Sequence, residues 1–251
     1  MLEACVNQAA GLQGFVLQTA PRVMAMASHG QQQGELPLLW RLCATLSDLG
    51  YPVMVLDANA VESPENPGLL QRLAGESGQG DEADEPGAWS VLPSALGLQQ
   101  LVRRAQRHAR PLDPLGNVLP NYGVVVIYAR ADVLTQLLPG SSIEPLLTVS
   151  PVKMSSVTAY QALKQMLLEA GLRPTVANIA LGSNAGRTPA TQLPVHHLQA
   201  CAQSFLGYRL DALTIEARQP DDQITDDIHR LAMRLLENAM PLGRLATARN
   251  H

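Results

Sequence analysis

A polar, glycine-containing loop, residues 28–34, is the segment whose residue types and spacing indicate chemistry most clearly. It follows a short apolar run, residues 23–27, and precedes a helical pattern that ends at Gly50. Loops between a strand and a helix bind phosphate groups through the backbone N–H groups at the helix N-terminus. A second apolar run ends at Asp57, which completes a strand, loop, helix and strand within about 35 residues. Many proteins share this order, so it indicates a phosphate site only weakly by itself.

Other candidates for metal binding are sparse. His196 and His197 are adjacent, so on a helix they point about 100° apart and do not chelate one ion without further ligands. The cysteines include no C-x-x-C pair, which favours reduced, mostly buried thiols over a disulfide framework or a zinc site. They are Cys5, Cys43 and Cys201. We therefore expect no metal site.

The chain that must position these residues has the composition of an ordinary globular protein. Its 251 residues, 46% apolar and 16% charged, allow one α/β domain that buries roughly 70–75% of its unfolded surface. A formal net charge of −4 gives no general attraction to nucleic acid or anionic lipid, so we expect no direct nucleic-acid binding and only peripheral membrane contact. The N-terminus lacks the basic region of a signal peptide, and the apolar run 124–129 is too short to cross a bilayer. A cytoplasmic protein is therefore expected.

From residue 22 onwards, short apolar runs alternate with longer helical patterns, which predicts βαβ units and a mostly parallel sheet with helices on both faces. The acidic, glycine-rich stretch 75–87 predicts a surface loop within the same domain. The expected strands are 23–27, 52–56, 123–129, 145–149, 175–180 and 213–215, and the expected helices are 36–49, 98–110, 156–170, 193–206 and 224–240.

The predicted helix 98–110 has a basic face. Arg103 and Arg107, and likewise Arg104 and His108, are four residues apart and so share a side of a helix. A solvated helix face is the favoured interpretation, and a docking surface for an acidic partner or DNA is the alternative.

Three segments resemble the MinD/ParA family of P-loop ATPases. Residues 22–57 resemble the family's first strand, deviant Walker A loop, helix and second strand. Residues 122–131 (YGVVVIYARA) resemble its "YDxVxxD" strand, and residues 147–160 (LTVSPVKMSSVTAY) resemble the strand and helix that usually read "VVTTPEPTSITDAY". The resemblance implies a MinD-like P-loop fold over residues 21–251.

A fourth match points to the flagellar branch of that family, FlhG, also called FleN. Residues 7–13 resemble the "DQAxxLR" motif that FlhG proteins carry ahead of the ATPase domain, where an amphipathic helix docks on the GTPase FlhF. Residues 1–20 are therefore predicted to be a partner-binding segment. Asn7 and Gln13 replace the charged ends of the motif, which leaves Gln8 and the apolar side chains of Ala9 and Leu12 for contact.

The loop departs from the family where phosphate and magnesium would be held. Such a loop needs small residues, two lysines and a Ser or Thr hydroxyl. By the resemblance, the signature lysine falls on Gly30, two glycines on Gln31 and Gln32, the Walker lysine on Glu35 and the magnesium-binding threonine on Leu36; Gly34 is retained. At ~4 Å and an effective dielectric near 20, Glu35 would repel a phosphate charge by roughly 4 kcal/mol.

The acidic positions of the family change as well. Asp57 matches the first aspartate after the second strand, but the catalytic aspartate falls on Asn59 and the magnesium-linked aspartate on Tyr128. An amide does not accept a proton from water at neutral pH. Glu35 has a structural role open to it instead, because a carboxylate in the first turn of a helix interacts favourably with the helix dipole. We therefore expect a degenerate nucleotide site without catalytic residues or cofactor.

The resulting hypothesis is a pseudo-ATPase that regulates flagellar number or placement through protein contacts. The resemblance implies an FlhF-like GTPase as a partner, together with flagellar switch proteins or a flagellar transcription activator. Two alternatives stay open. One is an active nucleotide-dependent enzyme in which Gln31, Gln32 and Gln33 bind the nucleotide without a lysine, and the other is a MinD-like scaffold in polar targeting or cellulose synthesis.

Overall fold

The computed structural model describes residues 20–30, 32–75, 89–152, 154–181, 189–217 and 226–243. The strands are β1 (Arg22–Ser28), β2 (Val53–Asp57), β3 (Trp89–Pro93), β4 (Val124–Arg130), β5 (Leu146–Val149), β6 (Thr175–Leu181), β7 (Ala212–Ala217) and β8 (Met240–Pro241). The helices are α2 (Gln32–Asp48), α3 (Leu69–Ala74), α4 (Ala95–Ala105), α5 (Asp113–Val118), α6 (Ala131–Leu137), α7 (Ser155–Ala170), α8 (Pro189–Leu206) and α9 (Asp226–Glu237).

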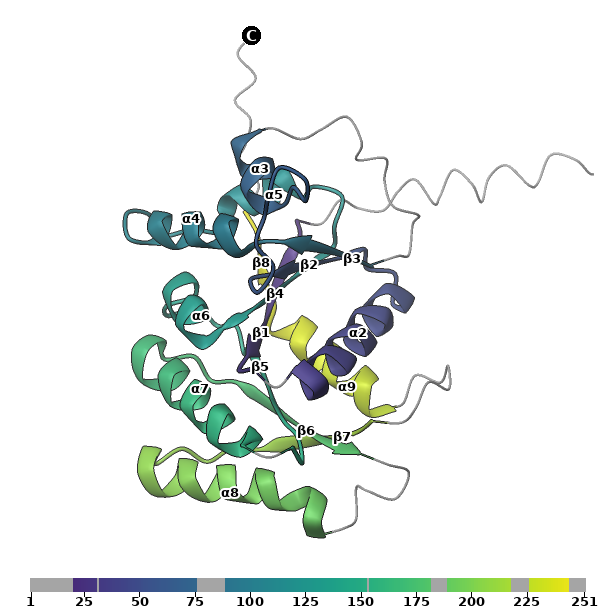
Figure 1. Ribbon diagram of the computed structural model, residues 1–251, viewed down its shortest axis with the longest axis vertical. Coiled ribbons are helices and arrows are strands. Elements are labelled where there is room, and N and C mark those ends of the chain that lie inside the picture. The colour runs from purple at the N-terminus through teal and green to yellow at the C-terminus, as the bar shows by residue number, and fades with distance from the viewer. Residues whose placement is uncertain are drawn as a thin grey trace, which may run out of the picture.

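The described strands form one sheet that is parallel except at β8. Its order is β3-β2-β4-β1-β5-β6-β7, and β8 pairs antiparallel with the start of β1. β1 lies between β4 and β5, with Val23 opposite Val125 and Ala27 opposite Ala129 (Figure 1). Residues 23–27 and 124–128 are therefore neighbours in parallel strands. The fold class predicted from the sequence is correct.

Helices cover both faces of the sheet, as predicted. α2 and α9 lie together on one face, and α4, α6, α7 and α8 lie on the other (Figure 1). Successive residues of β1 therefore enter two different cores: Ala25 and Ala27 pack in the larger one, and Met24 and Met26 in the one beneath α2. Burial on both faces explains why β1 and β4 are continuous apolar runs with no polar alternation.

Several predicted helix boundaries are wrong: α4 begins three residues early at Ala95, α8 begins four residues early at Pro189, and α9 ends three residues early at Glu237. α2 begins at Gln32, four residues before the expected start at Leu36. Pro37, which the expected start would place in the first turn, therefore lies inside the helix. α4 ends at Ala105, five residues before the expected end, and the N–H groups of Arg107 and His108 beyond it both donate to the carbonyl oxygen of Arg104. The predicted helical basic face is therefore split between the end of α4 and the connection that follows it.

The sequence did not predict β3, β8, α3, α5 or α6. The three helices have only six or seven residues and β8 has two, too few to show a period, and β3 (WSVLP) is not a continuous apolar run. Within the described ranges, none of the helices has the length and apolar character needed to cross a membrane.

Candidate functional site

The β1–α2 connection lies at the carboxyl edge of the sheet, where α/β proteins bind ligands. Gly30 has a φ of +88°, a conformation that a residue with a side chain rarely adopts. Gly34, in the first turn of α2, has a different constraint. A Cβ atom there would lie 3.1 Å from Ser150 Cβ and 3.2 Å from Ser150 Oγ, so the glycine allows α2 to start close against the end of β5.

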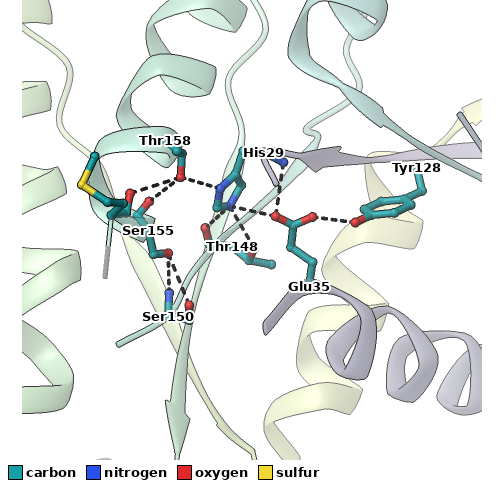
Figure 2. Close-up of polar contacts among 8 residues, drawn as sticks. His29, Glu35, Tyr128, Thr148, Ser150, Ser155 and Thr158 are labelled. Atoms are coloured by element: carbon teal, nitrogen blue, oxygen red, sulfur yellow. Dashed lines mark hydrogen bonds and ion pairs between the residues drawn. The ribbon is translucent and has the colours of Figure 1, made fainter. Parts of the chain in front are cut away.

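Glu35 lies in the first turn of α2, next to this connection, and its side chain is fully buried, with 0% exposed. Tyr128 at the end of β4 donates a hydrogen bond from its hydroxyl to Glu35 Oε2 at 2.6 Å, and the backbone N–H of His29 donates to Glu35 Oε1 at 3.2 Å (Figure 2). The shorter distance is typical of a hydroxyl bound to a charged carboxylate. The Glu35 carboxylate thus accepts a hydrogen bond from a backbone N–H of the loop.

His29 connects this carboxylate to β5 and α7. Its Nε2 atom lies 2.9 Å from the carbonyl oxygen of Thr148 and 3.5 Å from Glu35 Oε1. Both oxygens are acceptors, so Nε2 carries a hydrogen. Nδ1 lies 2.9 Å from Thr158 Oγ1 (Figure 2). With only 3% of its side chain exposed, the imidazole fixes the loop to two neighbouring elements.

The environment of Tyr128 keeps its hydroxyl protonated. Burial raises the pKa of this phenol well above its usual value, and the hydrogen bond to Glu35 raises it further, while a hydrogen bond with Ser28 acts in the opposite direction. Tyr128 therefore remains a hydrogen-bond donor to Glu35 throughout the physiological pH range.

Asp57 and Asn59 pair with each other at the next strand. Asp57 Oδ1 accepts hydrogen bonds from the backbone N–H of Asn59 at 2.8 Å and from its side-chain amide at 3.1 Å. This is an Asx turn that ends β2. Asp57 lies opposite Tyr128 in the sheet register, so it belongs to the same edge as Glu35.

A polar hollow of about 320 Å³ opens beside the loop, between α6 and α7. His29, Gly30 and Asn59 line one side of it, and the other side includes Arg130, Asp132, Gln161 and Gln165. Glu35 is not among the lining residues. The hollow therefore lies beside His29 and Gly30 and not against the Glu35 carboxylate.

The structure brings most of the predicted nucleotide-site residues to one edge. Glu35 and Tyr128 are in direct contact, Asp57 and Asn59 form one turn, and Leu36 is partly buried against the core beneath α2. The predicted partner-binding residues Asn7, Gln8, Ala9, Leu12 and Gln13 lie outside the described residues, as does Gln31. Where the chain is described, no cluster of three or more His, Cys, Asp or Glu side chains could hold a metal ion.

Sequence analysis missed the polar side chains that hold His29 in place. Thr148 and Thr158 contact the imidazole, and Ser155 Oγ accepts from the N–H of Ser150 at 3.0 Å. These four residues are close in sequence, but small hydroxyl residues are common at strand ends and helix starts, so their pattern carries no specific signal.

Comparison with known proteins identifies the fold. No protein-family model and no curated protein matches the sequence. Among solved structures, the chain is similar to the MinD cell division protein of Aquifex aeolicus (14% identity, 88% of this chain and 99% of that chain covered, TM-score 0.54). It is also similar to cobyrinic acid a,c-diamide synthase from Mycobacterium smegmatis with bound ADP and magnesium (15%, 89% and 99%, 0.54), and to a plasmid partition protein from Borrelia burgdorferi (15%, 87% and 97%, 0.52). The chain has the fold of MinD/ParA-like P-loop ATPases, and identity this low relates it to them by fold alone.

Proposed function

We propose that this protein is a pseudo-ATPase that keeps the MinD-like fold and regulates other proteins through contact. The main support is the Glu35 carboxylate, which is buried in the first turn of α2 and bonded to the His29 N–H and the Tyr128 hydroxyl. In phosphate-binding loops, backbone N–H groups point at the phosphate and a lysine balances its charge. In this chain the Glu35 carboxylate accepts a hydrogen bond from the backbone N–H of His29 in the loop. Glu35 stands at the position that the family resemblance assigns to the lysine.

Electrostatics opposes a second anion beside this carboxylate. Two negative charges ~4 Å apart repel by roughly 4 kcal/mol at an effective dielectric near 20. Turning Glu35 outward to admit a phosphate would leave the Tyr128 hydroxyl and the His29 N–H without their acceptor, at a cost of about 1–3 kcal/mol for each buried group. Leu36 offers no oxygen to magnesium, so the residues present do not fit a triphosphate with its metal ion.

The two positions that the resemblance assigns to the catalytic and the magnesium-linked aspartate carry no carboxylate in this chain. The Asn59 amide donates to Asp57, and an amide has no basic lone pair to accept a proton from water. Tyr128 is a protonated phenol directed at Glu35 and replaces the aspartate that the resemblance links to magnesium. Phosphoryl transfer would therefore lack the lysine, the metal ligand and the water-positioning carboxylate.

Calorimetry with the full chain tests the pseudo-ATPase proposal. Titration with ATP or ADP in the presence of magnesium should show no saturable binding at nucleotide concentrations below the millimolar range. A micromolar dissociation constant for either nucleotide would overturn the proposal and favour an enzyme with a non-standard loop. ATP turnover should equal that of buffer with magnesium.

We further propose a regulatory role in flagellar number or placement, with an FlhF-like GTPase as partner. The support is the resemblance of residues 7–13 to the FlhG motif together with the MinD-like fold of the domain that follows. Flagellar switch proteins or a flagellar transcription activator are the further partners that this resemblance implies. Contact with the GTPase should depend on Gln8 and on the apolar residues Ala9 and Leu12.

A GTPase assay on the cognate partner tests this role. The intact chain should accelerate GTP hydrolysis, whereas a chain lacking residues 1–20 should not, and Gln8→Ala should reduce the acceleration. Gln18→Ala, a change of the same type beyond the motif, serves as the control. Equal rates with all forms, together with an unchanged pull-down, would remove the N-terminal segment from the regulatory mechanism.

A further inference from the structure

A second cavity, of about 690 Å³, lies at the opposite edge of the sheet from Glu35. It is formed where the connection after α4, the end of α6 and β8 meet, and β8 pairs with the first residues of β1. Most of its lining is apolar and includes Ala109, Leu137, Leu138, Met240 and Leu242. Its volume and its apolar lining with a few polar groups are typical of pockets that bind small molecules.

An arginine-rich stretch, residues 103–113, runs along one side of this cavity, and Arg110 is the arginine of that stretch that lines it. The stretch contains four arginines, Arg103, Arg104, Arg107 and Arg110, against the single carboxylate of Asp113. Within the described ranges none of the four makes an ion pair, and Arg110 lines the cavity directly together with His108. A local excess of three positive charges, on a chain whose net charge is −4, attracts an anion to this place.

Asp113 also lines the cavity, and its single carboxylate leaves the net excess of three positive charges over residues 103–113. It lies in the first turn of α5, where a carboxylate interacts favourably with the helix N-terminus. Ser141 adds a further polar group to the lining. Its Oγ atom is buried and has no hydrogen-bond partner in the part of the chain that the structure describes. A buried hydroxyl without a partner is uncommon in folded proteins and points to a ligand group that would bond to it.

We propose that this cavity binds a small amphipathic carboxylate, with its hydrocarbon chain against Leu137, Leu138 and Leu242 and its carboxylate at Arg110. A guanidinium pairs with a carboxylate through two parallel N–H···O bonds, and burial of the chain supplies affinity roughly in proportion to its length. The site is independent of the carboxyl edge of the sheet, and it does not rest on the proposed loss of ATPase activity.

Isothermal titration of the full chain with decanoate tests the site. Decanoate should bind saturably at one site per chain, whereas acetate, which has no apolar chain, should not bind. Decanol, which has the chain without the charge, should bind about tenfold more weakly or worse than decanoate, because it forms no ion pair with Arg110.

Two pairs of variants separate this site from general attraction to the basic stretch. Arg110→Gln should raise the dissociation constant of decanoate about tenfold without affecting decanol, while Arg107→Gln, an exposed arginine outside the lining, should change it less than about threefold. Ala109→Phe places a ring at a lining position and should remove binding of both compounds. Ala44→Phe, at an exposed position on α2, should remove neither.

Three results would overturn the proposal. They are the absence of saturable decanoate binding, equal effects of the two arginine variants, and unchanged binding by Ala109→Phe. Circular dichroism establishes that each variant is folded. If Ala109→Phe does not fold, the comparison of Arg110→Gln with Arg107→Gln decides the question.

Discussion

The hydroxyl of Tyr128 lies 2.6 Å from Oε2 of Glu35, and the two residues are 93 positions apart in the sequence. Both stand where the family resemblance assigns groups that hold phosphate and magnesium. In this chain they bind each other: the glutamate supplies the acceptor, and the phenol, with its raised pKa, supplies the donor. The hydrogen bond holds the first turn of α2 against β4, so Glu35 stabilises the fold.

Removing the hydroxyl of Tyr128 should destabilise the protein. Tyr128→Phe keeps the ring but leaves Glu35 Oε2 without this donor, so the free energy of unfolding should fall by about 1–3 kcal/mol. Urea denaturation measures the change. Tyr160→Phe is the matched control, because this partly buried tyrosine has no hydroxyl hydrogen bond in the described part of the chain, and it should shift stability by less than about 0.5 kcal/mol.

Neutralising Glu35 should weaken the loop without creating a nucleotide site. Glu35→Gln keeps the shape but replaces a charge-assisted hydrogen bond by a neutral one, so stability should fall by about 1–2 kcal/mol. Magnesium-dependent ATP binding should stay undetectable in calorimetry, because the lysine and the metal-binding hydroxyl are still missing. Micromolar ATP binding by this variant would mean that the Glu35 charge alone excludes the nucleotide.

Stability should decline at alkaline pH because of two buried acids. Burial raises the pKa of the Cys43 thiol from 9.0 to about 12, and it raises that of Tyr128 above its ordinary value of 10.0. Both groups stay protonated in the folded state while they ionise in the unfolded chain. Their contribution to stability is therefore complete below pH 9 for Cys43 and below pH 10 for Tyr128, and it is lost as the pH rises towards the folded-state pKa.

A cysteine variant separates the two contributions. In this window each group lowers the free energy of unfolding by at most about 1.4 kcal/mol per pH unit. Cys43→Ala should remove the contribution of Cys43 to this slope. It should also lower the free energy of unfolding by an amount that does not depend on pH, because it leaves a cavity. Urea denaturation at a series of pH values from 8 upward measures the slope. Cys201→Ala is the matched substitution, and an equal effect of both variants on the slope would contradict the assignment to Cys43.

The close approach of α2 to β5 should make Gly34 intolerant of a side chain. Gly34→Ala would place Cβ 3.1 Å from Ser150 Cβ, so Ser150 or the helix start must move by a few tenths of an ångström, with an expected loss of about 1–3 kcal/mol. Ser150→Gly removes both contacting atoms, although it also removes the Ser150 hydroxyl that lies 3.4 Å from Ser155 Oγ. In a double-mutant cycle the two changes should therefore cost less together than the sum of the single variants. Strict additivity would show that the contact has no energetic effect.

The sequence by itself determined the architecture of this protein. β1 and β4 are continuous apolar runs, and α7 and α9 have apolar residues at helical intervals. Such patterns arise because each buried position of a strand or helix needs an apolar side chain. The alternation of these elements then implies parallel crossovers and a common carboxyl edge for Gly30, Glu35, Asp57 and Tyr128. Local patterns of this kind do not require knowledge of distant contacts.

Only the tertiary structure decided how the residues at that edge contact one another. From the sequence, Glu35 replaces the family's lysine by a residue that repels phosphate, and Tyr128 replaces an aspartate. The hydrogen bond between them depends on the placement of β4 beside β1, which no local pattern encodes. The same holds for the cavity at Arg110, whose lining comes from segments more than 100 residues apart, α4 and β8 among them. Side-chain contacts between distant segments depend on backbone positions to within about an ångström, and the periodicity of a sequence fixes only which face of each element is buried.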